Sequence, residues 1–259
     1  MMSHTILVTL TEISVKEEPM PNPVVHFEAT GKDGGALRDF YAKAFGWTFD
    51  VMEEMQYGVV DNGGRGINGG IAGQGEAPAA AIFYVGVPDP QATLNQVESL
   101  GGKTAAPVME IPDVVTFAQF TDPEGNLIGI IKDEGSGPPP SEAPPSEYPV
   151  TWFEVVGKDG PKLREFYGSV FGWNFNVMDA PSDYGMVDNG GQGIDGGVGT
   201  APEPHACWYV EVPDPQAHLD KIKGLGGTVV MPAENLGMVT VGMFTDPEGS
   251  LVGLYKSNQ

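Results

Sequence analysis

Cysteine, basic side chains and long apolar runs are all scarce in this chain of 259 residues. Its single cysteine, Cys207, cannot form an internal disulfide, which is typical of proteins from a reducing compartment. No apolar run approaches the ~20 residues that cross a bilayer. Residues 5–10 (TILVTL) are too short for a signal peptide and lack its basic flank. We therefore predict a cytoplasmic protein.

The shortage of basic side chains gives a formal net charge of -22, from 35 acidic and 13 basic residues. Such a chain repels phosphate backbones and anionic headgroups, so we expect neither nucleic acid nor a membrane as a partner. The hydrophobic content of 41% is that of a globular protein. The acidic excess indicates a well-solvated surface, and attraction of cationic ligands is the alternative.

An internal repeat is the main feature that is present. The segment PVVHFEATGKDGGALRDFYAKAFGW begins at Pro23 and aligns without a gap with PVTWFEVVGKDGPKLREFYGSVFGW, which begins at Pro149. Each copy closes with TDPEG and a short apolar run, and a segment rich in Pro, Ser and Glu separates the copies. The repeat predicts two homologous domains in tandem. The predicted parts are a leader (1–22, of which 1–19 are a disordered tail or foreign to the native protein), a first domain (23–132), an exposed linker (133–148) and a second domain (149–257).

Each copy shows strand and helix patterns in the same order. Residues 35–45 and 90–100 have the apolar spacing of helices, and glycine follows each of them. Short runs rich in β-branched and aromatic residues indicate strands between and after these helices. The order is β-α-β-β-β twice in each copy. We therefore predict an α+β fold of two domains, each made of two such modules.

Several motifs resemble one known superfamily. They are HFEATGKD from His26, the FY pair at Phe40 and the FGW triplet at Phe45, followed by YVGVPD and TDPEGN. With their counterparts in the second copy, these motifs resemble the vicinal-oxygen-chelate superfamily. It includes glyoxalase I, extradiol dioxygenases, fosfomycin-resistance enzymes and bleomycin-resistance proteins, and the chain is most similar to bacterial two-domain glyoxalase-related proteins. The resemblance implies paired modules that wrap a sheet around a cleft, with metal ligands on the first and last strands of each module.

The metal positions implied by the resemblance can be read one at a time. In the first copy they hold His26, Asn68, Ile82 and Gly129. In the second copy they hold Trp152, Asp195 or its neighbour Gly196, Cys207 and Gly253. A catalytic divalent ion needs about three ligands and an open position, and neither copy supplies three there. We therefore predict no metal and no other cofactor, with the two glycines standing where the last carboxylate ligand would be.

An unconventional metal site in the second copy is the alternative. His205 precedes Cys207 by two residues, so both side chains share one face of a strand and could join Asp195. The competing interpretation places His205 at an exposed strand start and Cys207 in the core. The weak metal candidates are thus His26, Asp195 and His205. His218, on a polar helix, is expected to be solvated.

Strand alternation gives each cleft a carboxylate. His26 and Glu28 should face one side of their strand, and Trp152 and Glu154 should do so in the second copy. A glutamate that points into a cleft must be solvated, paired or hydrogen-bonded, if only to the backbone of the cleft floor. Glu28, Glu154 and His26 are therefore the candidate catalytic residues. The residues predicted to bind a ligand are His26, Glu28, Tyr84, Gly129, Trp152, Glu154, Cys207, Tyr209 and Gly253.

A glycine-rich loop offers a different interpretation. The spacing G-x-G-x-x-G occurs at Gly64, Gly66 and Gly69, and it recurs in the second copy. A dinucleotide site needs this spacing after a strand and before a helix. Another strand follows here, so we predict a hairpin or a bulge instead.

Three functions remain open. We expect first the metal-independent binding of a small organic molecule, cationic or aromatic, in a resistance or sequestration role. The alternatives are a metal-dependent lyase or extradiol dioxygenase with an unconventional site, and a metal-free acid–base enzyme that uses Glu28 or Glu154. The second copy is favoured for the ligand because Trp152 adds a ring. The two domains should form a pseudo-dimer within the chain, which is compatible with a monomeric protein.

Overall fold

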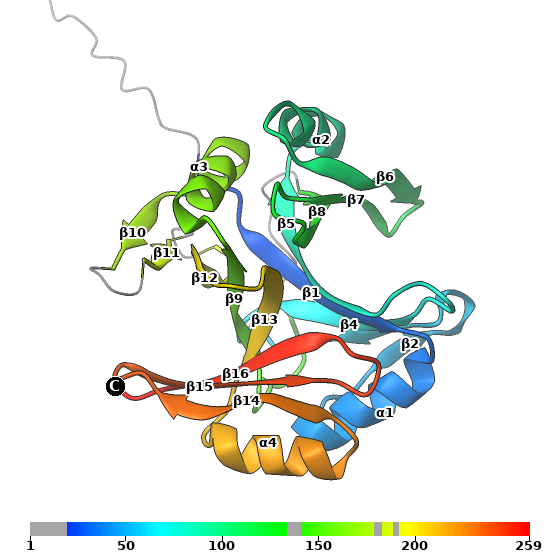
Figure 1. Ribbon diagram of the computed structural model, residues 1–259. Helices are drawn as coiled ribbons and strands as arrows, with labels where there is room; N and C mark the ends of the chain where they lie inside the picture. Colours follow the sequence, from blue (N-terminus) through cyan, green and yellow to red (C-terminus); the bar gives the residue numbers. More distant parts are fainter. Residues whose placement is uncertain (1–19, 134–140, 179–182, 189–191) are drawn as a thin grey trace, which may run out of the picture.

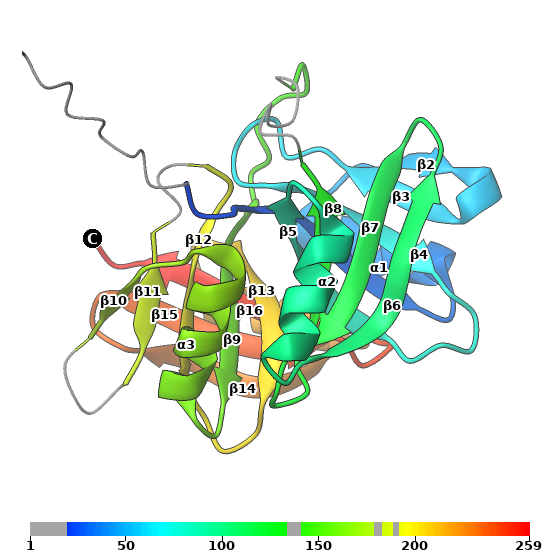
Figure 2. The ribbon, with the colours of Figure 1, turned by 90° about the horizontal axis from the view of Figure 1, so that it is seen from above.

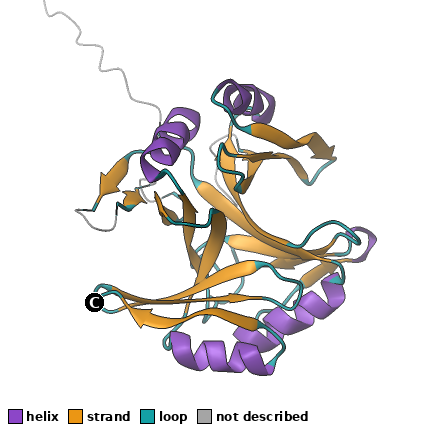
Figure 3. Ribbon diagram, viewed as in Figure 1, coloured by secondary structure: helices purple, strands orange, loops and turns teal. Residues whose placement is uncertain are grey.

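The computed structural model describes residues 20–133, 141–178, 183–188 and 192–259. The predictions for residues 1–19 and 134–140 fall outside this described part. The described residues form two 8-stranded sheets and the α-helices α1 to α4 (Figure 1, Figure 3). None of these helices is long and apolar enough to cross a membrane.

Domain 1 contains two modules of the predicted order. The first consists of β1 (Val24–Gly31), α1 (Gly34–Phe45), β2 (Asp50–Met52), the short 3-10 helix η1 (Glu53–Met55), β3 (Tyr57–Val60) and β4 (Asn68–Gly73). The second consists of β5 (Ala80–Val87), α2 (Pro90–Ser99), β6 (Lys103–Ile111), β7 (Val115–Thr121) and β8 (Leu127–Lys132).

Domain 2 repeats both modules, which confirms the predicted α+β fold. Its first module consists of β9 (Val150–Gly157), α3 (Gly160–Phe171), β10 (Phe175–Val177), β11 (Gly185–Val187) and β12 (Asp195–Thr200). Its second consists of β13 (His205–Glu211), α4 (Pro215–Gly224), β14 (Thr228–Asn235), β15 (Val239–Thr245) and β16 (Leu251–Ser257).

The long helices begin and end at residues suited to capping. The carboxylates of Asp33 and Asp159 accept hydrogen bonds from amides in the first turns of α1 and α3, at 2.9 and 3.2 Å. Gly46 and Gly172 follow these helices in the left-handed conformation, each with a φ of 71°. The GKD and FGW motifs therefore mark the two ends of one helix in each domain.

Both modules of a domain share one sheet. In domain 1 the strand order is β2-β3-β4-β1-β5-β8-β7-β6, with β1 and β5 antiparallel at the centre. Domain 2 has the equivalent order β10-β11-β12-β9-β13-β16-β15-β14. Each cleft is therefore built within a domain, because strands from both of its modules meet in a single sheet.

Alternation along β1 sends neighbouring side chains to different environments. Phe27 is fully buried and packs on Trp208 of domain 2, with ring centroids 4.8 Å apart. His26 and Glu28 point to the opposite face, where they line a cavity. The predicted orientation of this strand is confirmed. One face of the sheet serves the core between the domains, and the other lines the cavity.

The domains pack on one another through a shared core. Helix α1 lies beside α4 (Figure 1), and α2 lies beside α3 (Figure 1, Figure 2). Phe83 on β5 packs against Phe153 on β9, with ring centroids 4.8 Å apart. Buried side chains of both domains belong to one continuous cluster. The two sheets thus meet through their apolar faces.

The repeated DPEG turns join the domains reciprocally. The Glu124 carboxylate accepts hydrogen bonds from the amides of residues 158 and 159, at 3.0 and 2.8 Å. The Glu248 carboxylate accepts from the amides of residues 32 and 33, at 3.2 and 3.4 Å. Each glutamate therefore binds the backbone just before the first helix of the other domain, where free amides and the helix dipole favour a negative charge.

The glycine-rich loops make a second reciprocal contact. Strands β3 and β4 pair antiparallel, so this loop is a hairpin connection, as predicted. The amide of Ile67 donates to the Val150 oxygen at 3.0 Å, and that of Ile194 donates to the Val24 oxygen at 3.2 Å. Gly66 has a φ of 72°, and a Cβ there would lie 2.1 Å from the Val150 oxygen. Glycine is required because the other domain approaches so closely.

His218 corrects an expectation. It is only 9% exposed, and its ring lies 4.8 Å from that of Tyr148 and 6.4 Å from that of Phe45, measured between centroids. Phe45 belongs to α1, beside which α4 is packed. The prediction of a solvated histidine was wrong because the exposed-looking face of α4 is covered by domain 1.

The described half of the predicted linker is attached rather than free. The Ser141 hydroxyl donates to Asp61 at 2.7 Å, and the amide of Ser146 donates to the Asn62 oxygen at 3.0 Å. At the other end, Asn22 of the predicted leader accepts a hydrogen bond from Trp173 of domain 2 at 2.7 Å. Residues 141–148 and Asn22 therefore belong to the packed structure.

Candidate functional site

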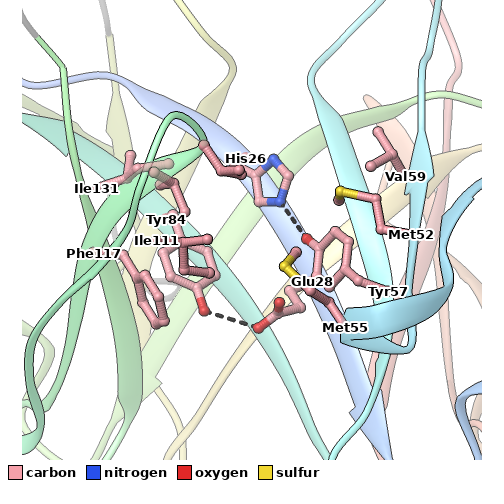
Figure 4. A pocket seen from close by; sticks show the side chains of 12 residues that line it. His26, Glu28, Met52, Met55, Tyr57, Val59, Tyr84, Ile111, Phe117 and Ile131 are labelled. Atoms are coloured by element: carbon pink, nitrogen blue, oxygen red, sulfur yellow. Dashed lines mark hydrogen bonds between the residues drawn. The ribbon is translucent and has the colours of Figure 1, made fainter.

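A cavity of about 420 Å³ lies on the face of the domain 1 sheet to which His26 and Glu28 point (Figure 4). This volume is within the range of small-molecule sites. Its polar lining side chains are His26, Glu28, Tyr57 and Tyr84. Its apolar wall includes Met52, Met55, Val59, Ile111, Val114, Val115, Phe117 and Ile131. The cavity is thus mainly apolar, with a small polar group at its base.

Glu28 is the acidic side chain among the lining residues, and a tyrosine holds it. The Tyr84 hydroxyl donates to Oε2 at 2.8 Å, and the nearby Tyr57 hydroxyl also favours the charged form of the carboxyl group. Gln119 in turn donates its amide hydrogen to the Tyr84 oxygen at 2.9 Å. Burial raises the pKa of the Glu28 carboxyl, and the tyrosine hydrogen bonds offset part of this shift. The carboxylate has neutral donors around it and no counter-charge among the described residues that line the cavity.

His26 is uncharged at neutral pH. Burial lowers the pKa of its imidazole from 6.5 to about 4. Its Nε2 lies 2.8 Å from the Tyr57 hydroxyl oxygen. Which of the two groups donates depends on the tautomer of the neutral imidazole: an Nε2–H donates to the tyrosine oxygen, and a bare Nε2 accepts from the hydroxyl.

Domain 2 keeps this arrangement with a different ring. The indole Nε1 of Trp152 donates to the Tyr184 oxygen at 3.3 Å, and Tyr184 donates to Oε1 of Glu154 at 3.0 Å. Tyr209 donates to Oε2 of Glu154 at 2.8 Å. Trp152 therefore keeps a ring nitrogen in hydrogen-bond contact with the tyrosine, as His26 does in domain 1. This explains how the ring can change while the glutamate stays.

Tyrosine rings occupy the space above the strand glycines. A Cβ on Gly129 would lie 2.2 Å from the Tyr84 ring, and one on Gly253 would lie 2.1 Å from the Tyr209 ring. Each glycine stands beside its tyrosine in a parallel pair of strands. The space beside Gly129 and Gly253, both predicted to bind a ligand, is therefore filled by the tyrosine that holds the glutamate.

The domain 1 residues at the superfamily's metal positions do not fit a metal ion. Ile82 and Gly129 have no donor atom. The side-chain oxygen of Asn68 accepts a hydrogen bond from the Asn62 amide at 2.8 Å. His26 uses Nε2 to orient Tyr57, and no other ligand-forming side chain stands at these positions. No metal-dependent step can be built on this set.

Domain 2 brings three possible metal donors together elsewhere. Glu154, His205 and Cys207 each offer one ligand atom, and these atoms lie within 4.8 Å of one another. Asp195, the expected partner, is exposed at the start of β12 and is replaced by Glu154 in this group. The exposed position predicted for His205 is only partly right, since its side chain is 26% exposed and reaches toward Glu154.

The ionisation of this group depends on burial and on Glu154. Burial lowers the pKa of His205, but the Glu154 carboxylate outweighs this effect and the net shift is upward. Burial raises the pKa of the Cys207 thiol well above its usual value, and the charge of Glu154 adds to the rise. Cys207 is fully buried, so it also has the core position that the competing interpretation gave it.

Sequence reasoning missed the second tyrosine of each site. Tyr57 and Tyr184 open the repeated segments YGVVDNGG and YGMVDNGG, so their recurrence was visible. Their role was not, since the loop and short strand before them give no clear alternation. Gln119 could not be found from the repeat, because it does not recur. Met243 occupies the equivalent position of domain 2, opposite Gly253 as Gln119 is opposite Gly129.

Two family models match the chain. Residues 24–130 match the Glyoxalase/Bleomycin resistance protein/Dioxygenase superfamily, and residues 150–190 match the model described as Bleomycin resistance protein-like N-terminal. The chain belongs to the vicinal-oxygen-chelate superfamily. The tandem arrangement inferred from the repeat is thus that of a two-domain vicinal-oxygen-chelate protein.

Two relatives with curated names have similar sequences. CFP32 of Mycobacterium bovis, which carries a provisional glyoxylase name, is 31% identical over 121 residues, or 42% of this chain and 45% of CFP32. The match therefore spans less than half of that relative. The anthracycline biosynthesis protein DnrV of Streptomyces peucetius is 26% identical over 239 residues, which cover 81% of this chain and 84% of DnrV.

Solved structures of this vicinal-oxygen-chelate fold superpose over most of the chain. The Mn(II)-bound glyoxalase of Novosphingobium aromaticivorans gives a TM-score of 0.61 at 16% identity, covering 93% of this chain and 83% of the glyoxalase. The 2,3-dioxygenase LapB of Pseudomonas sp. KL28 gives 0.62 at 14% identity, with 93% and 94% covered. At these identities the likeness establishes the fold alone.

Proposed function

We propose that domain 1 binds a flat, largely apolar organic molecule through a basic or hydrogen-bond-donating group, without a metal ion. The observation that carries this proposal is the placement of Glu28 in an apolar cavity of about 420 Å³. An ionised carboxylate is costly in such surroundings unless a ligand adds a charge or further donors. Resistance to, or sequestration of, a small molecule is the role that such binding would serve.

The charges of the cavity support a cationic ligand. None of its described lining residues is Lys or Arg, and His26 is neutral. Rings of Tyr57, Tyr84 and Phe117 form part of the wall and can contact an aromatic or cationic group. The net charge of -22 would also favour the approach of cations. The relation to DnrV, named for anthracycline biosynthesis, is in line with an aromatic ligand.

Acid–base catalysis by Glu28 is the second candidate. Its raised pKa favours it, since an effective general base titrates nearer to the working pH than an ordinary carboxylate does. Glu28 would accept a proton from an acidic group of the bound molecule and return it to a neighbouring atom. Tyr57 and Tyr84 would adjust their hydrogen bonds to the two states of the carboxyl group.

Calorimetric titration with aromatic amines, neutral aromatics and anionic thiol conjugates tests the binding proposal. We expect the amines to bind best. Replacement of Glu28 by Gln should weaken the best ligand by roughly tenfold to a hundredfold, equivalent to the 1.5–3 kcal/mol of a hydrogen bond to a charged group. The shape of the side chain is retained, so the fold should persist.

The second domain provides the matched control. Glu154→Gln makes the same change in the equivalent place and should leave the affinity of the domain 1 site unchanged. Preferential binding of anionic thiol conjugates, or an affinity insensitive to Glu28→Gln, would refute the proposal. Proton exchange between a bound ligand and deuterated solvent, lost in Glu28→Gln, would instead identify acid–base catalysis.

A further inference from the structure

The strands of domain 2 place three different metal-binding side chains on one face. Cys207 on β13 stands directly opposite Glu154 on β9, and His205 lies two residues earlier on the same side of β13. Their ligand atoms lie within 4.8 Å of one another. The equivalent places in domain 1 hold Ile82, opposite Glu28, and Ala80. The donor set is therefore a property of domain 2 alone.

His205 presents an unused ring nitrogen to this group. Its Nδ1 lies 3.1 Å from the carbonyl oxygen of Glu203 and donates hydrogen to it. Its Nε2 is buried without a hydrogen-bond partner and lies 3.6 Å from Oε2 of Glu154. That separation is too long for a hydrogen bond. A bond from Nδ1–H to a backbone carbonyl is also how proteins orient a histidine that binds a metal through Nε2.

The separation of the donors suits one metal ion. With Zn–N and Zn–O bonds of ~2.0–2.2 Å at a tetrahedral angle, two ligand atoms lie ~3.4 Å apart, close to the 3.6 Å between Nε2 and Oε2. The carboxylate is already oriented, since Tyr184 and Tyr209 donate to its two oxygens at 3.0 and 2.8 Å. Each oxygen keeps a second lone pair for an ion.

We propose that Glu154, His205 and Cys207 form a zinc site in domain 2. Of the three, only Cys207 stands at one of the superfamily's metal positions, and the other positions of this copy hold Trp152, Asp195 or its neighbour Gly196, and Gly253. A thiolate with an imidazole selects zinc over magnesium or calcium. Zinc with one thiolate and one carboxylate is electrically neutral, so the buried group has no net charge when the ion is bound. Three protein ligands leave a fourth position for water.

Binding is coupled to proton release. The thiol gives its proton to solvent as sulfur binds the ion, so each zinc releases at least one proton, and affinity rises with pH. No oxidation or reduction is involved. The zinc site would operate independently of the cavity in domain 1, since the two lie on separate sheets.

Cobalt(II) titration of the reduced, metal-free full chain tests this site. We expect one equivalent to bind with a near-ultraviolet thiolate-to-cobalt band and the visible spectrum of a tetrahedral ion, and zinc should displace it. Cys207→Ser should remove the thiolate band. Tyr184→Phe removes a hydrogen bond to the ligand Glu154 and should weaken cobalt binding by roughly 10–100-fold. His205→Gln, at the partly exposed start of β13, removes a ligand itself and should weaken cobalt binding by more than that.

His26→Gln is the control, because it removes a histidine of domain 1 and leaves the three donors intact. It should bind cobalt as the unaltered chain does. Circular dichroism of each variant checks that the sheet has formed. Cobalt binding without a thiolate band, binding that survives both Cys207→Ser and His205→Gln, or binding lost in His26→Gln would overturn the proposal. Absence of binding to the folded chain would overturn it as well.

Discussion

At the scale of single residues, each glutamate is held by a conserved pattern of contacts within the chain. In domain 1 the ring nitrogen bonded to the tyrosine belongs to His26, and in domain 2 it belongs to Trp152. The ring nitrogen is retained across the two copies while the ring type is not. The position thus works as an orienting group for tyrosine and glutamate, which is a different task from binding a metal.

The low pKa of His26 predicts a pH dependence of stability. The folded state resists protonation down to about pH 4, whereas the unfolded histidine binds a proton below 6.5. The unfolded state therefore gains protons first, and the free energy of unfolding falls as the pH drops from 6.5 to about 4. His26→Gln keeps an N–H donor and should flatten this decline, by roughly 1–3 kcal/mol at pH 4.

Urea unfolding of the unaltered chain and of the His26→Gln variant, at pH 7 and at pH 4.5, measures the free energy of unfolding that each loses on acidification. The raised pKa of Glu28 acts in the opposite direction, since the folded state then binds protons more readily than the unfolded state above the usual pKa of 4.5. This contribution is present in both proteins, so their difference reports on His26. If the free energy of unfolding falls equally in the two proteins, His26 binds a proton as readily in the folded state as in the unfolded state.

At the scale of secondary-structure elements, the glycines of β8 and β16 make room for a neighbouring strand's tyrosine. A side chain on the last strand would displace the ring that holds the glutamate. The glycine that weakens a strand is tolerated because a large ring packs over it. The hydroxyl of Tyr84 then reaches Glu28, so the arrangement of two strands controls the site.

Gly129→Ala tests this coupling. Its Cβ would lie 2.2 Å from the Tyr84 ring, which must move. We expect a loss of about 1–3 kcal/mol in the free energy of unfolding, as for overpacked cores, together with weaker ligand binding. Gly224→Ala is the control, since no atom outside its immediate chain neighbourhood lies within 4 Å of the added Cβ. Unchanged stability in Gly129→Ala would mean that Tyr84 can move at no cost.

At the scale of the whole molecule, the repeated motifs connect the two domains. Tyr41 donates to Asp246 at 3.0 Å, and Tyr167 donates to Asp122 at 2.8 Å, both across the interface. Trp47 donates to the backbone carbonyl oxygen of Tyr148 in the linker at 2.9 Å, and its ring lies 6.2 Å from that of Trp208 in domain 2, measured between centroids. The FY, FGW and DPEG motifs are thus interface motifs, and their recurrence reflects reciprocal packing.

The shared core predicts that the domains depend on one another. Separate chains of residues 20–132 and 141–259 would expose Phe27, Phe83, Phe153 and Trp208 to water, so neither should show a cooperative thermal transition like that of the intact protein. When the two fragments are mixed or coexpressed, they should associate and regain a cooperative thermal transition. Calorimetry and size-exclusion chromatography measure both outcomes. Fragments that each unfold cooperatively as monomers, at the temperature of the intact chain, would contradict this prediction.

The sequence by itself determined the repeat, the module order and the superfamily, because these depend on local spacing and on gapless similarity between copies. It also placed His26 and Glu28 on one face, since alternation along a strand has a fixed period. The lack of ligands at the superfamily's metal positions could likewise be read from residue types alone.

Only the tertiary structure decided which neighbours these residues meet. Register across strands placed Cys207 opposite Glu154 and turned the Tyr84 ring over Gly129. Packing between domains buried His218 and gave the DPEG glutamates their amide partners. Such contacts join residues far apart in the chain, and their pairing depends on how whole sheets meet. No local pattern of amino acids contains that information.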